Sequence, residues 1–268
     1  MLKRLLPAVL SLALLAVPLP AAATDYTDIW YLPSESGWGV NLIQAEDVIF
    51  VTFFIYGQAS EPATPSNQPT WFVAIIYRDG NGNFSGNLYS TIGSYFGVPW
   101  NPAEHPAATL AGTASFVPTS PYQGTLTYTL IGGPTVVKSI ERQTLKTIVL
   151  GADYVGGQTG SYSSCSDSSR NGVYHDTYKL SVTHANGAAT FIFTYASGAT
   201  CSMAGTLLQY GQLYRIDPAS YSCTGSLMFN ASATMEEIKA TAQGIEGRFT
   251  AGLSGGCTET AYFSAVLF

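Results

Sequence analysis

Charged residues are scarce in this sequence, and their scarcity excludes several classes of protein. Asp, Glu, Lys and Arg make up 10% of the 268 residues, and the 11 Lys and Arg residues form no basic patch. Nucleic-acid binding depends on Lys and Arg contacts to phosphates, so we expect no nucleic-acid partner. Helices favour Ala, Leu, Glu, Lys and Arg, whereas this chain has 27 Gly, 17 Tyr and 13 Phe. The composition therefore predicts an all-β fold with many turns.

Long apolar runs are absent after the first few residues. Residues 5–19 are largely apolar, follow Lys3 and Arg4, and precede the small residues Ala21-Ala22-Ala23. This order is typical of a secretory signal peptide. We predict a signal peptide over residues 1–23 and an exported bacterial protein, periplasmic or extracellular. No other run is long enough to span a bilayer, so we expect no stable membrane insertion after signal cleavage.

Cysteine is missing before Cys165, and tryptophan is missing after Trp100. This uneven distribution indicates two consecutive modules, one rich in aromatic residues and one containing disulfides. We place the first module at residues 24–145, a linker at 146–159 and the second module at 160–268. Both should be antiparallel β modules, each a small barrel or sandwich.

The four cysteines form no C-x-x-C pair and have no histidine beside them, so we expect no zinc, no other metal and no cofactor. In an exported protein they indicate disulfides, with three possible connectivities. If the second module closes on itself, Cys165 and Cys257 lie on its first and last strands. A nested pairing, Cys165 with Cys257 and Cys201 with Cys223, would then fit.

Alternating apolar residues predict strands in both modules. In the first module the pattern is clearest at residues 38–43, 48–56 and 70–78, and Asp79-Gly80 follows as a hairpin turn. We expect seven or eight strands there. The second module offers ten short segments separated by turns, which favours an up-and-down meander of the lipocalin or avidin type. Residues 235–242 could instead form a short helix.

A Pro- and Gly-rich loop at residues 93–106 contains four rings, those of Tyr95, Phe96, Trp100 and His105. Exposure of all four rings to water would be unfavourable. We therefore expect the loop to fold over an apolar surface as a lid.

Residues 28–41 contain two tryptophans around a short polar turn. The residues that stand out are Trp30, Pro33, Glu35, Ser36, Gly37, Trp38, Gly39 and Asn41. They match the pattern W-x-x-P-x-E-S-G-W-G-x-N, and an aromatic strand and Pro69-Thr70-Trp71 follow. Over about residues 25–145 the chain resembles a β module of uncharacterised exported bacterial proteins. The resemblance implies export and a β fold, but no activity.

We interpret the protein as a non-catalytic binding protein with an aromatic-lined pocket for a small apolar or carbohydrate ligand, because small barrels hold such ligands at their mouths. The candidate ligand-binding residues are Trp30, Glu35, Ser36, Trp38, Asn41, Trp71 and Trp100. A packed aromatic core would explain the same tryptophans. The alternative function is an accessory module that contacts an envelope protein.

A second alternative is a hydrolase that uses Glu35 or Ser254. Glu35 lies between two tryptophans, where an apolar environment could raise its pKa for acid–base chemistry. A structural role in the turn would also explain it. Ser254 fits the pattern G-x-S-x-G, but a strand segment rather than a helix follows it. A glycine-rich turn explains that pattern better.

Overall fold

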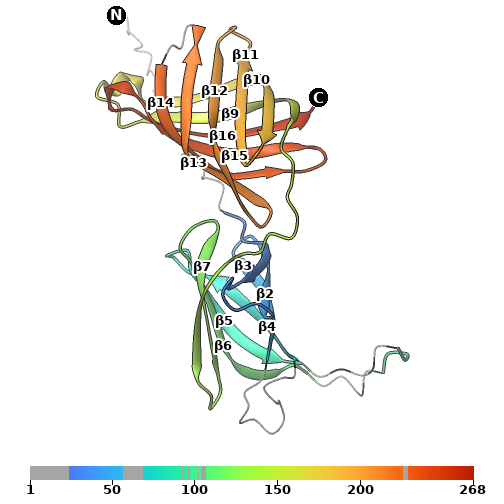
Figure 1. The fold of residues 1–268 in the computed structure, drawn as a ribbon. Coiled ribbons are helices and arrows are strands. Elements are labelled where there is room, and N and C mark those ends of the chain that lie inside the picture. The colour runs from blue at the N-terminus through green and yellow to red at the C-terminus, as the bar shows by residue number, and fades with distance from the viewer. Residues whose placement is uncertain are drawn as a thin grey trace, which may run out of the picture.

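The computed structural model describes residues 24–56, 69–91, 107–225 and 229–268, together with 93, 95, 97–101 and 103. The predicted signal peptide lies outside these residues. The chain forms two consecutive closed antiparallel barrels of eight strands, which follow one another along the molecule (Figure 1). The prediction of an all-β fold with two barrel-type modules is confirmed.

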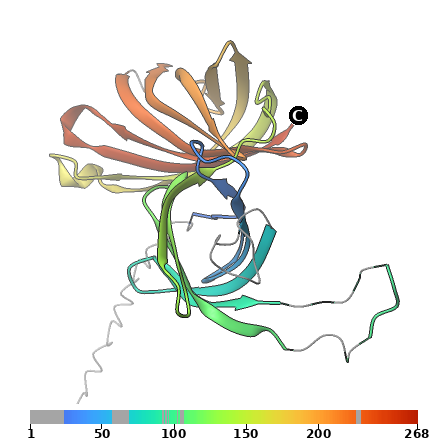
Figure 2. The same ribbon diagram turned by 60° about the horizontal axis from the view of Figure 1, so that its bottom comes forward.

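In the first barrel each strand pairs with its neighbours in sequence, and the first strand pairs with the last. Figure 2 shows this barrel closing into a ring below the second barrel. Its strands are β1 (Asp28–Tyr31), β2 (Gly39–Ala45), β3 (Val48–Tyr56), β4 (Pro69–Arg78), β5 (Phe84–Ser90), β6 (Thr109–Pro118), β7 (Gln123–Leu130) and β8 (Thr135–Arg142).

The second barrel has the same meander order, closed by pairing of its last strand with its first. Its strands are β9 (Ala152–Ser163), β10 (Gly172–Ala185), β11 (Ala188–Tyr195), β12 (Thr200–Tyr210), β13 (Leu213–Thr224), β14 (Phe229–Ala240), β15 (Gly244–Gly252) and β16 (Thr258–Leu267). Two short 3-10 turns, η2 (Ser168–Arg170) and η4 (Ser254–Gly256), precede β10 and β16.

Three details of the second module differ from the sequence-based expectation. β9 begins at Ala152, so residues 152–159 of the expected linker belong to the barrel. Gly156 and Gly157 suggested a linker, but backbone of the neighbouring strands approaches both too closely for a side chain. Residues 213–224 form one strand rather than two, which reduces the number of segments. The helix alternative for residues 235–242 is wrong, because residues 235–240 continue β14.

The first barrel is filled by apolar side chains. Strand β3 shows the principle, since Ile49, Val51 and Phe53 are buried while Phe50 and Tyr56 are exposed. Successive side chains of a strand point to opposite faces, and every second residue therefore enters the barrel. The largest side chains inside are Trp30, Phe53, Phe84 and Phe116, all with no exposed surface.

Two disulfides stabilise the second barrel. Cys165 is bonded to Cys257 and Cys201 to Cys223, so the nested pairing is confirmed. The first bond joins the segments that follow β9 and precede β16, which are neighbours because the barrel closes there. The second joins opposite residues of β12 and β13.

The junction between the barrels is a network of polar contacts centred on Arg142. Its guanidinium donates to the carbonyl oxygens of Pro121 and Thr27, at 2.8 and 3.2 Å, and pairs with the Asp28 carboxylate at 3.2 Å. The same carboxylate accepts the backbone N–H of Gln212 in the second barrel at 3.1 Å. The Arg142 side chain is 1% exposed and that of Asp28 is 5% exposed. The contact that joins the barrels is therefore largely shielded from water.

Candidate functional site

The four tryptophans do not converge on one cavity. Trp30 is completely buried, Trp38 is half-buried, and Trp71 and Trp100 are 57% and 71% exposed. Trp71 points outward from β4 and lies against Phe54, with ring centroids 6.3 Å apart. The expectation of one pocket lined by all four indoles is therefore wrong.

Trp30 is part of the packed core. Its indole N–H donates to the carbonyl oxygen of Tyr26 at 3.0 Å, and its ring meets Phe116 edge to face at 5.2 Å. The guanidinium of Arg142 lies 5.0 Å from the centre of the same ring. Both the ring and the polar N–H of Trp30 are thus satisfied inside the protein, and the core interpretation holds for this residue.

The lid expected at residues 93–106 is not formed by the described part of that segment. Tyr95 is 77% exposed and Trp100 is 71% exposed. The described residues between β5 and β6 project away from the barrel in Figures 1 and 2. Phe96 and His105 lie outside the described residues.

Glu35 and Trp38 do meet in a pocket, at the end of the first barrel that faces away from the second. The pocket has a volume of about 200 Å³. It is lined by Glu35, Trp38, Phe53, Ile55, Tyr56, Leu126, Tyr128, Val136 and Lys138. Most of these side chains are apolar or aromatic, and the two charged groups are the exceptions.

The charged pair is held in place by three contacts. The Lys138 ammonium donates to both oxygens of Glu35, at 2.9 and 2.7 Å. The indole N–H of Trp38 donates to the same carboxylate at 3.2 Å, and Lys138 lies 5.8 Å from the centre of the indole ring. Lys138 was missed from the sequence. It could have been found there, because it shares the inward face of β8 with the buried Ile140.

This geometry overturns the idea that Glu35 has a raised pKa. The hydrogen bond from Lys138 lowers the pKa of Glu35 below its ordinary value, and the Trp38 N–H lowers it further. An ionised carboxylate paired with ammonium is a poor general acid. Glu35 can still accept hydrogen bonds from a ligand.

The remaining two predicted residues lie beside the pocket without lining it. Ser36 is exposed in the turn between β1 and β2, which is closed by a hydrogen bond from Glu35 N–H to the Leu32 carbonyl at 2.9 Å. Gly37 supplies the positive φ of 110° in that turn, which other residues rarely adopt. Asn41 alternates with the buried Val40 and Leu42 and so faces the outside of the barrel.

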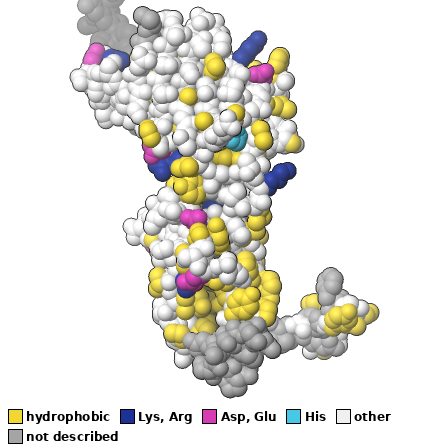
Figure 3. All heavy atoms as spheres, in the orientation of Figure 1, with side chains coloured by type: hydrophobic (Ala, Val, Ile, Leu, Met, Phe, Trp, Pro, Cys, Tyr) yellow, Lys and Arg dark blue, Asp and Glu magenta, His cyan; other side chains and the backbone are white. Residues whose placement is uncertain are grey.

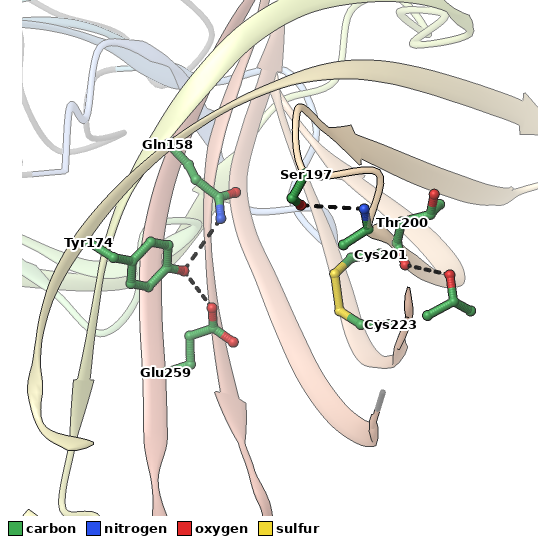
Figure 4. The surroundings of a disulfide bond; sticks show 9 residues. Gln158, Tyr174, Ser197, Thr200, Cys201, Cys223 and Glu259 are labelled. Carbon is green, nitrogen blue, oxygen red and sulfur yellow. Dashed lines mark hydrogen bonds between the residues drawn. A yellow bond between two sulfur atoms is a disulfide. The ribbon is translucent and has the colours of Figure 1, made fainter. Parts of the chain in front are cut away.

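A second polar cluster, absent from the sequence-based candidates, lies inside the disulfide-bearing end of the second barrel. Glu259 on β16 is 2% exposed, and Gln158 on β9 is 7% exposed. The Tyr174 hydroxyl donates to Oε1 of Glu259 and accepts from the Gln158 amide at 3.4 Å (Figure 4). In Figure 4 the free oxygens of Gln158 and Glu259 point toward the side of the Cys201–Cys223 disulfide.

Tyrosines surround this cluster. They are Tyr162, Tyr174, Tyr195 and Tyr221, which come from β9, β10, β11 and β13. Burial and the nearby Glu259 carboxyl raise the pKa of Tyr162 to about 12 and raise the pKa of Tyr174 and Tyr221 further. Burial also raises the pKa of Glu259, although the three tyrosine hydroxyls partly offset it. The sequence holds a signal for Glu259, since it shares strand parity with the buried Ala261 and Phe263.

A larger pocket of about 570 Å³ lies at the junction of the two barrels. Its wall includes Arg142 and Arg248, but these guanidiniums already pair with Asp28 and with Glu236 and Glu237. We therefore regard the junction pocket as a consequence of docking between the barrels. The two barrel ends offer more specific chemistry.

Ser254 does not sit in a nucleophile elbow. It is exposed in η4, between two antiparallel strands, whereas the elbow requires a strand followed by a helix. His184 accepts the backbone N–H of Leu150 at 3.3 Å, and His175 bonds Thr159 at 3.0 Å. Within the described residues, no group of three His, Cys, Asp or Glu side chains could hold a metal ion.

No family model matches this chain, and no curated protein matches it. The resemblance carried by Trp30 to Asn41 therefore stays an expectation. In the part of the chain that the structure describes, no helix has the length and apolarity needed to cross a membrane.

Proposed function

We propose that the protein is a non-catalytic binding protein whose first barrel holds a single-ring ligand in the pocket at Trp38. The observation that carries this proposal is the combination of an aromatic wall with one ion pair. Trp38 and Tyr128 supply ring faces, while Glu35 and Lys138 supply an acceptor and a donor at the edge. Sugars have this character, since they combine an apolar ring face with hydroxyls at the edge.

The size of the pocket supports a small ligand. An apolar cavity of about 150 Å³ holds one benzene molecule, and drug-sized ligands occupy about 300–1,000 Å³. A pocket of about 200 Å³ therefore suits one sugar ring or one small aromatic ring. The Glu35 and Lys138 side chains are 44% and 30% exposed, so a ligand can reach them from solvent.

The indole N–H groups give a direct test. Glucose, N-acetylglucosamine and p-cresol would be added separately, at about 10 mM, to the ¹⁵N-labelled full chain. A ligand in the pocket should shift the Trp38 indole signal, because that N–H contacts Glu35. The Trp30 signal should stay unchanged, because its N–H is buried against Tyr26.

Two variants complete this experiment. Trp38→Ala should abolish binding while the far-UV circular dichroism stays that of the wild type, and Trp71→Ala, on the outer wall, should bind normally. If none of the three probes moves the Trp38 signal, the proposal is overturned. A shift confined to Trp71 would overturn it too, because that indole lies outside the pocket.

A second candidate function is contact with another protein through the outer wall of the first barrel. Ile43, Phe50 and Ile75 lie opposite one another on β2, β3 and β4, and are 56%, 40% and 44% exposed. Trp71 and Tyr77 extend the same face, at 57% and 58% exposed. Figure 3 shows hydrophobic side chains gathered on the surface of the first barrel. Large exposed apolar patches are typical of interaction sites.

This candidate is tested by placing a charge at the centre of the patch. Ile75→Lys should reduce capture of an envelope protein from a cell-envelope extract, whereas Val149→Lys, which changes an equally exposed residue outside the barrel strands, should not. Equal capture by both variants would exclude the patch as a docking surface.

We also propose that the protein is exported. Two disulfides support this, because such bonds persist in oxidising compartments such as the periplasm. N-terminal sequencing of the protein recovered outside the cytoplasm should begin at Thr24. A start at Met1 would contradict the predicted signal peptide.

A further inference from the structure

The second barrel contains two buried acceptor atoms without a hydrogen-bond partner. They are Oε2 of Glu259 and Oε1 of Gln158. The hydroxyls of Tyr162 and Tyr221 face the Glu259 carboxyl, but neither makes a hydrogen bond to Oε2. A buried polar atom without a partner costs about 1–3 kcal/mol, so such atoms are rare unless something else occupies the site.

The missing partner is a hydrogen-bond donor. An ionised carboxylate and an amide oxygen both accept only, and Tyr174 already donates its one proton to Glu259. None of the ion pairs formed by the described residues includes Glu259. The carboxyl is therefore buried without a cation of the protein's own, which is unfavourable unless it is protonated or a ligand supplies the charge.

The surroundings suit a cation with an organic body. Tyr162 and Tyr174 stack with ring centroids 5.1 Å apart, and Tyr221 meets Phe229 edge to face at 4.8 Å. The faces of aromatic rings carry partial negative charge and attract ammonium groups. Tyr162, Tyr174 and Tyr195 are only half-buried, so the aromatic rim is in contact with solvent at this end of the barrel.

We propose that the disulfide-bearing end of the second barrel binds the primary or secondary ammonium group of a small organic amine. The ammonium N–H groups donate to Oε2 of Glu259 and Oε1 of Gln158, and the tyrosine rings contact the carbon atoms beside the nitrogen. Eight-stranded barrels commonly hold one small ligand at the mouth. This site is independent of the pocket at Trp38, which lies at the far end of the other barrel.

Binding should be coupled to a proton. Burial raises the pKa of Glu259, so the free protein holds the carboxyl proton at a higher pH than an exposed glutamate would. The ammonium group favours the ionised carboxylate, and its binding therefore releases that proton. Affinity should fall as the pH drops through the pKa of Glu259. The titratable groups that act on this carboxyl are Tyr162, Tyr174, Asp176 and Tyr221.

The test uses calorimetry on the full chain with benzylamine and with benzyl alcohol, which has the same shape but no charge. Benzylamine should bind at least tenfold more tightly than benzyl alcohol at pH 7. Near the pKa of Glu259, the measured heat should depend on the ionisation enthalpy of the buffer, which reports proton release. No binding of benzylamine at 10 mM, or equal binding of the two probes, would overturn the proposal.

Variants assign the binding to this end of the barrel. Glu259→Gln keeps the side-chain shape and should weaken benzylamine binding at least tenfold. Glu246→Gln, at an exposed position of β15, should leave it unchanged, and so should Trp38→Ala. Unchanged binding by Glu259→Gln would overturn the proposal. If that variant does not fold, the comparison of the two probes and the proton release in the wild type still decide the matter.

Discussion

Removal of the charge of Asp28 should destabilise the protein strongly, because this carboxylate is the counterion of a buried arginine. In Asp28→Asn the Arg142 guanidinium stays buried, with its contacts to the Pro121 and Thr27 carbonyls intact. Loss of one partner of a buried ion pair costs about 3–5 kcal/mol. Because the carbonyl contacts survive, we expect a loss at the lower end, about 3 kcal/mol.

The loss should appear in both thermal and chemical unfolding. For a protein of this size, 1 kcal/mol corresponds to about 2–4 °C in Tm, so the Tm of Asp28→Asn should fall by about 6–12 °C. The matched control is Asp47→Asn. Asp47 pairs with Arg78 at 3.9 Å, but its side chain is 80% exposed. Exposed pairs contribute about 0–1 kcal/mol, and the control should lose little stability.

A double-mutant cycle separates the ion pair from other effects of each change. Arg142→Met should also be destabilising, since it leaves Asp28 buried without its partner. The combined variant should lose less stability than the sum of the two single variants, by about 1–3 kcal/mol. Additive losses, or a loss below about 1 kcal/mol in Asp28→Asn, would refute the reasoning.

Two further predictions concern the second barrel. The Cys165–Cys257 bond closes a separation of 92 residues and Cys201–Cys223 one of 22, so replacing each pair by Ser should cost about 4.6 and 3.4 kcal/mol in urea unfolding under the chain-entropy model. The reverse order would contradict that model here. The raised pKa of Glu259 stabilises the fold fully below the ordinary pKa of 4.5, and this stability is lost as the pH rises through the raised value. The wild type should thus lose stability relative to Glu259→Gln between pH 4 and 8, and parallel urea profiles would disprove this.

The sequence predicted the fold class and the disulfides because both depend on local patterns and on chain order. Alternation of apolar residues marks strands wherever one face is buried. In a closed meander the first and last strands are neighbours, which places Cys165 beside Cys257. The boundary at Ala152 was missed because Gly156 and Gly157 serve close strand contacts rather than flexibility.

The candidate site was predicted only in part, because strand parity is hidden where both faces are apolar. Trp71 lies in the nearly continuous apolar run of β4, and the pattern gave no sign that it faces outward. Trp30 is equally prominent in the sequence but enters the core. Lys138 is distant from Glu35 in the sequence, so only the closed barrel brings the two together.

The two barrels are closed by seams of very different strength. In the second barrel β9 and β16 share ten registered residue pairs, and the Cys165–Cys257 bond adds a covalent link at one end. In the first barrel β1 and β8 share only two. A pulling force applied at the N-terminal side would therefore peel β1 away early, while the same force at the C-terminal side would meet a long ladder and a disulfide. The molecule is thus mechanically asymmetric, with its weakest joint at the strand that carries Trp30.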